Sequence, residues 1–145
     1  MKKYYESFHL VELNSTFYHY PRISTVAGWR DNAPADFEFT VKAHQDISHR
    51  FRFAVEPSLK PFEQMKEICK ILEAQVLLIQ THGSFGPNKL GDAYNFFRKI
   101  PRDDLECMHA IPIKPITLVS EQLKPEQRGF GISLILSNAF PVFTL

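Results

Sequence analysis

Apolar residues along the chain follow two different spacings. Phe37, Phe39 and Val41 alternate with polar residues, which is the period-two pattern of a strand. From Pro57 to Glu73 the apolar positions instead recur every three or four residues, as on one face of a helix. Extending this comparison predicts strands and helices in strict alternation. The predicted strands are Leu10–Leu13, Phe37–Val41, Val76–Ile79, Leu105–His109 and Ile132–Leu136, and the predicted helices are Ser24–Asn32, Pro57–Glu73, Asn88–Ile100 and Thr117–Leu123.

This alternation predicts an α/β protein with a parallel sheet, because parallel strands need long crossover connections. The continuous apolar run from Val76 to Ile79 suits a strand that is covered on both faces. A doubly wound open sheet and a barrel both fit this order. Neither a G-x-G-x-x-G motif nor a P-loop follows any predicted strand, which disfavours the nucleotide-binding open sheet. With 145 residues, we expect a single domain spanning residues 1–145.

Composition removes several classes of function. Lys and Arg total 17 and Asp and Glu total 16, so the formal net charge of +1 gives no electrostatic footprint for nucleic acid or for an anionic membrane. The basic cluster of His44, His49, Arg50 and Arg52 is too short to form a groove, so nucleic-acid binding is a weak alternative. We find no signal peptide and no apolar run near the ~18 residues that a membrane span needs. We therefore expect a cytoplasmic protein.

The sequence gives no metal or cofactor motif. Cys69 and Cys107 do not form a C-x-x-C pair, which argues against a thiolate zinc site. His44 and His49 lie five residues apart, which is not the spacing of a helical H-E-x-x-H motif. We expect neither a metal nor a cofactor.

Polar residues mark the end of each predicted strand. In parallel α/β folds, ligands bind at the carboxyl ends of the strands. These residues would then form the polar floor of a site, although every strand must also leave the core at some polar residue. The strand-end residues are Asn14, Lys42, Gln80, His109 and Asn138.

Glu12 and Lys42 are the most informative of the polar residues. Glu12 lies inside an apolar strand, two residues before Asn14, so the two side chains are expected on the same side. A buried carboxylate there would either pair with Lys42 to hold two strands together or belong to a site. Lys42 itself would bind a phosphate or carboxylate, form a Schiff base, or extend to solvent.

These residues suggest an enzyme that acts on a small polar substrate, either sugar-like or phosphorylated. Hydrolysis or isomerisation would use Glu12 as base, Lys42 as electrophile and His109 as acid. Glu106 is three residues from His109 and would face the same cavity, although two residues of a short loop would show the same spacing. Tyr18 would shape the wall of the pocket or simply pack against its neighbours.

Several segments resemble the YecE-like family, also called domain of unknown function 72. The resemblance implies a TIM-type (β/α) barrel without an established activity, and no cofactor or metal follows from it. Carried over by position, the mouth of the barrel would be lined by Glu12, Asn14, Thr16, Lys42, His49, Gln80, Glu106 and His109. The segments that carry the resemblance are Val11–Tyr18 with Pro21 and Trp29, Phe37–Ala43 with Ile47–His49, Leu77–Gln80, Leu105–His109 and Leu136–Pro141.

The chain also departs from the family pattern. It lacks the Gly-Thr-Ser-Gly-Trp strand, Met108 replaces a usual arginine, and Asn138 replaces a common aspartate. About five of the eight strands of a TIM barrel are recognisable. We therefore expect an incomplete barrel whose open sheet edges favour self-association. The alternative to an enzyme is a non-catalytic truncated barrel or gene fragment.

Overall fold

The computed structural model describes residues 5–101 and 105–110. The strands and helices that the sequence predicts in this part are confirmed, with ends that shift by one or two residues. The predicted helix at 117–123 and strand at 132–136 lie outside the described residues. The strands are β1 (Leu10–Leu13), β2 (Glu38–Lys42), β3 (Val76–Gln80) and β4 (Glu106–Ala110), and the helices are α2 (Ile23–Asp31), α3 (Val55–Leu72) and α4 (Leu90–Lys99).

The four described strands form one parallel sheet in the order β1-β2-β3-β4, so each strand lies beside its neighbour in the sequence. Glu12 of β1 pairs with Thr40 of β2, and Lys42 of β2 pairs with Leu78 of β3. The expected parallel α/β class is confirmed. Because all strands run in one direction, their carboxyl ends meet at one edge of the sheet.

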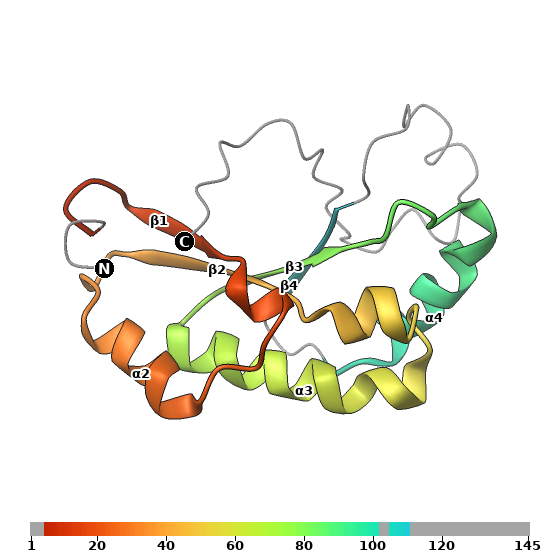
Figure 1. Cartoon of the computed structure of the whole chain (residues 1–145), viewed down its shortest axis with the longest axis horizontal. Coiled ribbons are helices and arrows are strands. Elements are labelled where there is room, and N and C mark those ends of the chain that lie inside the picture. The colour runs from red at the N-terminus through yellow and green to blue at the C-terminus, as the bar shows by residue number, and fades with distance from the viewer. Residues whose placement is uncertain (1–4, 102–104, 111–145) are drawn as a thin grey trace.

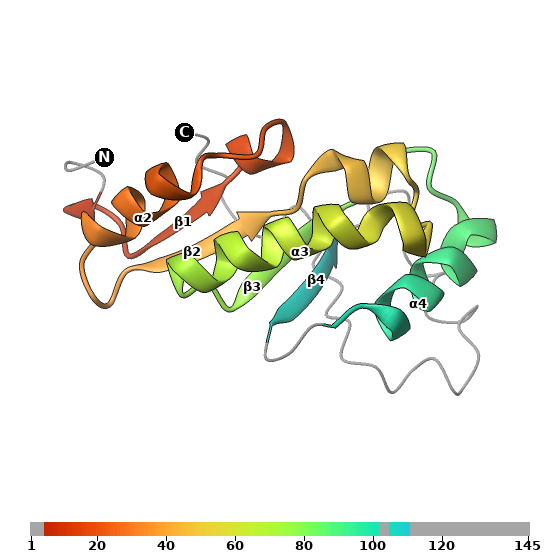
Figure 2. The same ribbon diagram turned by 90° about the horizontal axis from the view of Figure 1, so that it is seen from below.

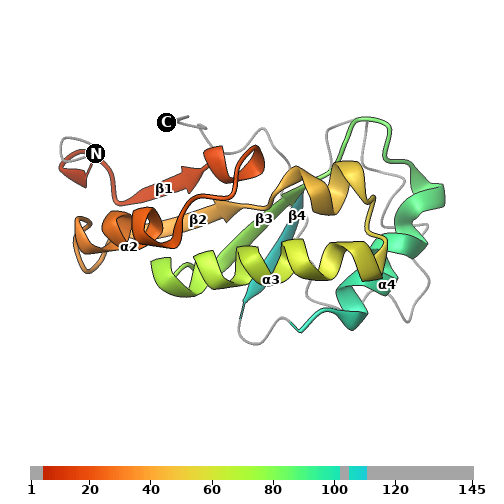
Figure 3. The ribbon, with the colours of Figure 1, turned by 60° about the horizontal axis from the view of Figure 1, so that its bottom comes forward.

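Helices α2, α3 and α4 lie on one side of the strands (Figures 1, 2 and 3). In β1, β2 and β3 the side chain of every second residue, among them Phe39, Val41 and Leu77, is buried beneath this layer. Helix α3 contributes the predicted apolar stripe, in which Phe62 and Met65 are fully buried. Burial of each such side chain stabilises the fold by about 1.5–3 kcal/mol.

The opposite face of the sheet is more open and more polar. In β3, Val76 and Leu78 are half-buried whereas Leu77 and Ile79 are buried. The apolar run is therefore not buried equally on both faces, in contrast to the prediction from the sequence. Because side chains alternate along a strand, the polar residues share this open face. It carries Leu10, Glu12, Glu38, Thr40, Lys42, Val76, Leu78 and Gln80.

Candidate functional site

Three segments that follow β1, β2 and β3 meet at the carboxyl edge of the sheet. They are the 3₁₀ turn η1 (Ser15–Phe17), the π-helical turn η2 (Asp46–Arg50) and the loop after Gln80. The buried hydroxyl of Thr16 lies 2.6 Å from the carbonyl oxygens of both Leu13 and Lys42, so its single proton is shared between the ends of β1 and β2. Thr16 therefore fixes the position of the ends of β1 and β2 relative to each other.

Lys42 is half-buried at the end of β2, on the same face as Glu12. Its Nζ atom lies 5.3 Å from the centre of the Phe17 ring, within range of a cation–π contact. Burial lowers the pKa of Lys42, and the negative charge of Glu12 partly opposes that effect. Glu12 and Lys42 thus attract each other, but in the described part of the chain no direct ion pair joins them.

His49 lies beside Lys42, in a small aromatic and imidazole cluster. Its ring is 5.0 Å from the ring of Phe17 and 5.5 Å from the ring of His82, both edge-to-face. Burial, followed by the charges of His82 and Lys42, lowers the pKa of His49. The imidazole is therefore neutral at pH 7 and available as a base.

Two serines hold the imidazoles in place. The buried Ser48 hydroxyl donates to the backbone carbonyl of Gln80 at 2.6 Å and lies 2.9 Å from Nδ1 of His49. Ser84 contacts Nδ1 of His82 through both its hydroxyl, at 2.8 Å, and its backbone N–H, at 3.1 Å. Sequence reasoning missed His82, Ser48 and Phe17. The available signal for His82 was its place two residues after the strand-end Gln80.

A second group consists of Tyr20, which follows η1, and of His44 and Asp46, just before and at the start of η2, and its three side chains contact one another. The ring of Tyr20 stacks on that of His44 at 3.9 Å, and its hydroxyl donates to Asp46 Oδ2 at 3.3 Å. Asp46 also lies 3.3 Å from Nδ1 of His44. Burial lowers the pKa of His44 and raises that of Tyr20, so both are neutral at pH 7. Residues 5–101 and 105–110 contain no cluster of three or more potential metal ligands.

The remaining predicted site residues do not all lie at the cluster around Lys42 and His49. Asn14 lies just outside β1, where the alternation with Glu12 ends, and its Nδ2 atom is buried without a hydrogen-bond partner among the described residues. Tyr18 is 60% exposed. Glu106 pairs with Val76 at the amino end of the sheet, and His109 pairs with Ile79 rather than with Gln80. Asn138 lies outside the described residues.

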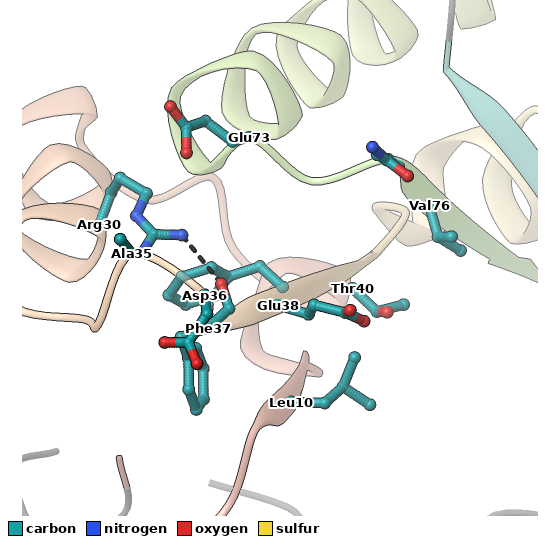
Figure 4. Close-up of a pocket in the computed structure, with 11 residues that line it drawn as sticks. Leu10, Arg30, Ala35, Asp36, Phe37, Glu38, Thr40, Glu73 and Val76 are labelled. Atoms are coloured by element: carbon teal, nitrogen blue, oxygen red, sulfur yellow. Dashed lines mark hydrogen bonds between the residues drawn. The ribbon is translucent and has the colours of Figure 1, made fainter.

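A hollow of about 240 Å³ lies at the other end of the strands, far along the sheet from this cluster. Its walls include Leu10, Glu38 and Val76, which are the first residues of β1, β2 and β3. Figure 4 shows the guanidinium of Arg30 bonded to the Phe37 carbonyl, at 2.9 Å. We favour the carboxyl edge as the site, because parallel sheets place ligands there and because the basic side chains gather there.

A model of the family described as "Protein of unknown function DUF72" matches residues 1–119. The chain belongs to the DUF72 family. The predicted resemblance is therefore confirmed. No curated protein matches the sequence.

Two crystal structures of a DUF72 family protein from Enterococcus faecalis V583 share its fold. The first, at 2.52 Å resolution, has a TM-score of 0.57 and 22% sequence identity, over 76% of this chain and 46% of that one. The second, at 3.10 Å, has a TM-score of 0.58 and 23% identity, over 77% and 42%. The chain thus spans less than half the length of this DUF72 relative. No helix among the described residues is long and apolar enough to cross a membrane.

Proposed function

We propose that this chain forms one wall of a TIM-type barrel and carries a small-molecule site at the carboxyl ends of its strands. The support is topological. Each described strand lies beside its sequence neighbour, with α2, α3 and α4 on one side. A doubly wound sheet instead places helices on both faces and reverses its strand order, whereas a barrel wall has this sequential order.

The ligand that suits this site is a small hydroxylated compound with an anionic group, such as a sugar phosphate. The single observation that carries the proposal is the half-buried ammonium of Lys42. It contacts the Phe17 ring and is attracted by Glu12, but it forms no direct ion pair with any residue that the structure describes. A phosphate or carboxylate would supply the missing counter-charge. Glu12 and the Asn14 amide nitrogen, which has no hydrogen-bond partner in the part of the chain that the structure describes, are suited to hydroxyl groups of the same ligand.

The chemistry that fits is proton transfer by the neutral imidazole of His49, beside the cation that binds the ligand. In this proposal His49 takes the role of base that sequence reasoning assigned to Glu12. His82 takes the role of acid that sequence reasoning assigned to His109, because its ring lies 5.5 Å from that of His49. The non-catalytic alternative retains the same contacts but produces no turnover.

The test is a titration of the ¹⁵N-labelled chain with sugar phosphates, and with the parent sugars as uncharged controls. We expect shifted amide signals from η1, η2 and the loop after β3. A hydrogen bond to a charged group contributes about 1.5–3 kcal/mol, so Lys42→Met should weaken binding by about 10- to 100-fold. Lys70→Met is the matched control, because Lys70 is exposed near the far end of α3.

Equal losses in the two lysine variants would show that the attraction is non-specific. Binding of no sugar phosphate at millimolar concentration would refute the proposed ligand class. Tight binding of the uncharged sugars would instead remove the role given to Lys42.

A further inference from the structure

The Nδ1 atoms of the two imidazoles at the carboxyl edge have opposite hydrogen-bonding roles, because one donates a hydrogen bond and the other accepts one. His49 comes from the turn after β2 and His82 from the loop after β3, and their rings meet edge-to-face at 5.5 Å. Each ring has its Nδ1 atom engaged by a nearby serine. A neutral imidazole carries its proton on one nitrogen only, and the partner of Nδ1 decides which.

At His82 the deciding partner is a backbone N–H. The amide of Ser84 donates to Nδ1 at 3.1 Å, and an amide N–H cannot accept a hydrogen bond. Nδ1 of neutral His82 is therefore the lone-pair nitrogen, and the proton resides on Nε2. His82 consequently presents an N–H donor on its remaining ring nitrogen.

At His49 the deciding partner is a hydroxyl with a single proton. Ser48 uses that proton to reach the Gln80 carbonyl at 2.6 Å, and a carbonyl oxygen can only accept. The contact between Ser48 Oγ and Nδ1 of His49, at 2.9 Å, must then be donated by the ring. His49 therefore carries its proton on Nδ1 and presents a lone pair on Nε2.

We propose that His49 and His82 form an acid–base pair of fixed polarity, with His49 Nε2 as base and His82 Nε2–H as acid. The pair suits isomerisation of an α-hydroxy carbonyl compound. His49 Nε2 would remove the proton on carbon, the electrons of that C–H bond would form the C=C bond of an enediol, the π electrons of the C=O bond would move onto its oxygen, and His82 Nε2–H would protonate that oxygen. Reversal at the neighbouring carbon completes the shift without any co-reactant. Ser48 and Ser84 are positioning residues in this scheme.

Charge at the cluster favours the same arrangement. The charged or titratable groups that act on His49 are His82 and Lys42, and both oppose protonation of His49. The base thus stays unprotonated at neutral pH. The acid–base role rests on the proposed ligand site, whereas the two tautomers do not.

The first experiment needs no ligand. Long-range ¹H–¹⁵N NMR of the histidine-labelled 145-residue chain at pH 8 should show His49 protonated on Nδ1 and His82 on Nε2. Ser48→Ala should shift His49 toward the Nε2–H form, and Ser48→Thr should restore the wild-type tautomer. Finding both rings in the same tautomer in the wild-type chain would overturn the proposal, whatever the fate of the ligand site.

The second experiment measures exchange of the carbon-bound proton of bound sugar phosphates in D₂O. His49→Gln should slow this exchange about 100-fold or more while ligand binding is retained, since general bases contribute factors of this size. His9→Gln is the control, because His9 is exposed before β1. Tight binding without any exchange in the wild-type chain would overturn the acid–base role. Absence of binding would refute the proposed function and with it the acid–base role, whereas the first experiment would still decide the two tautomers.

Discussion

Replacement of Thr16 by valine removes one hydroxyl from a fully buried position and leaves the shape of the side chain unchanged. That hydroxyl lies 2.6 Å from the carbonyl oxygens of Leu13 and Lys42, at the ends of β1 and β2. A buried acceptor that loses its donor costs about 1–3 kcal/mol. We therefore expect Thr16→Val to lower the free energy of unfolding by about 2 kcal/mol, or about 8 °C in Tm at ~4 °C per kcal/mol.

The variant Thr16→Ser distinguishes the contribution of the hydroxyl to stability from that of the methyl group. It retains the donor and loses one buried methyl, which contributes about 0.8 kcal/mol. Urea denaturation followed by circular dichroism should rank the proteins wild type, Thr16→Ser and Thr16→Val in order of falling stability. Thr16→Val at wild-type stability, or below it by less than about 0.5 kcal/mol, would show that the hydroxyl does not join the two strand ends as described.

Two further predictions concern pH and association. The pKa of His49 is lowered by burial and then by His82 and Lys42, so below its ordinary value of 6.5 the unfolded chain binds more protons than the folded one. Stability should thus be greatest above about pH 6.5 and fall as the pH drops below it. His49→Gln should reduce this slope in denaturation series between pH 8 and 5, and an unchanged slope would contradict the cause given for the shift. Strand β1 pairs only with β2 among the described residues, so light scattering with size exclusion should show concentration-dependent self-association, and a monomer at all concentrations would count against an open edge.

The sequence predicted the fold well where burial follows a regular period. Alternation identified β2, and the stripe around Phe62 and Met65 identified α3, because each pattern reflects one buried face. The register between neighbouring strands, by contrast, could not be predicted from these patterns. Nothing in the period of β4 shows that His109 pairs with Ile79, and this pairing depends on contacts between strands that are distant in sequence.

The same limit explains the candidate site. The sequence pointed to Lys42 and Glu12 because a charged residue in or at the end of an apolar strand stands out in the linear pattern of apolar and polar positions. His82 lies in a loop without any local sequence pattern. Its role is visible only in the fold, where the segments after β2 and β3 place the ring centres of His49 and His82 5.5 Å apart. Ser48 is similar, since its bond to the Gln80 carbonyl joins residues that are 32 positions apart.

The two ends of the sheet differ in whether their polar groups already have partners. At the amino end, the guanidinium of Arg30 donates to the carbonyls of Phe37 and Pro34 and lies over the ring of Phe39, so two of its five N–H donors and one face of the ion have partners within the fold. At the carboxyl end, the Lys42 ammonium has a ring contact but no direct counter-ion among the described residues, and the Asn14 amide nitrogen is buried without a partner. Unsatisfied buried donors lower stability unless something binds them. That cost supports a ligand at the carboxyl end more strongly than the hollow at the other end supports one there.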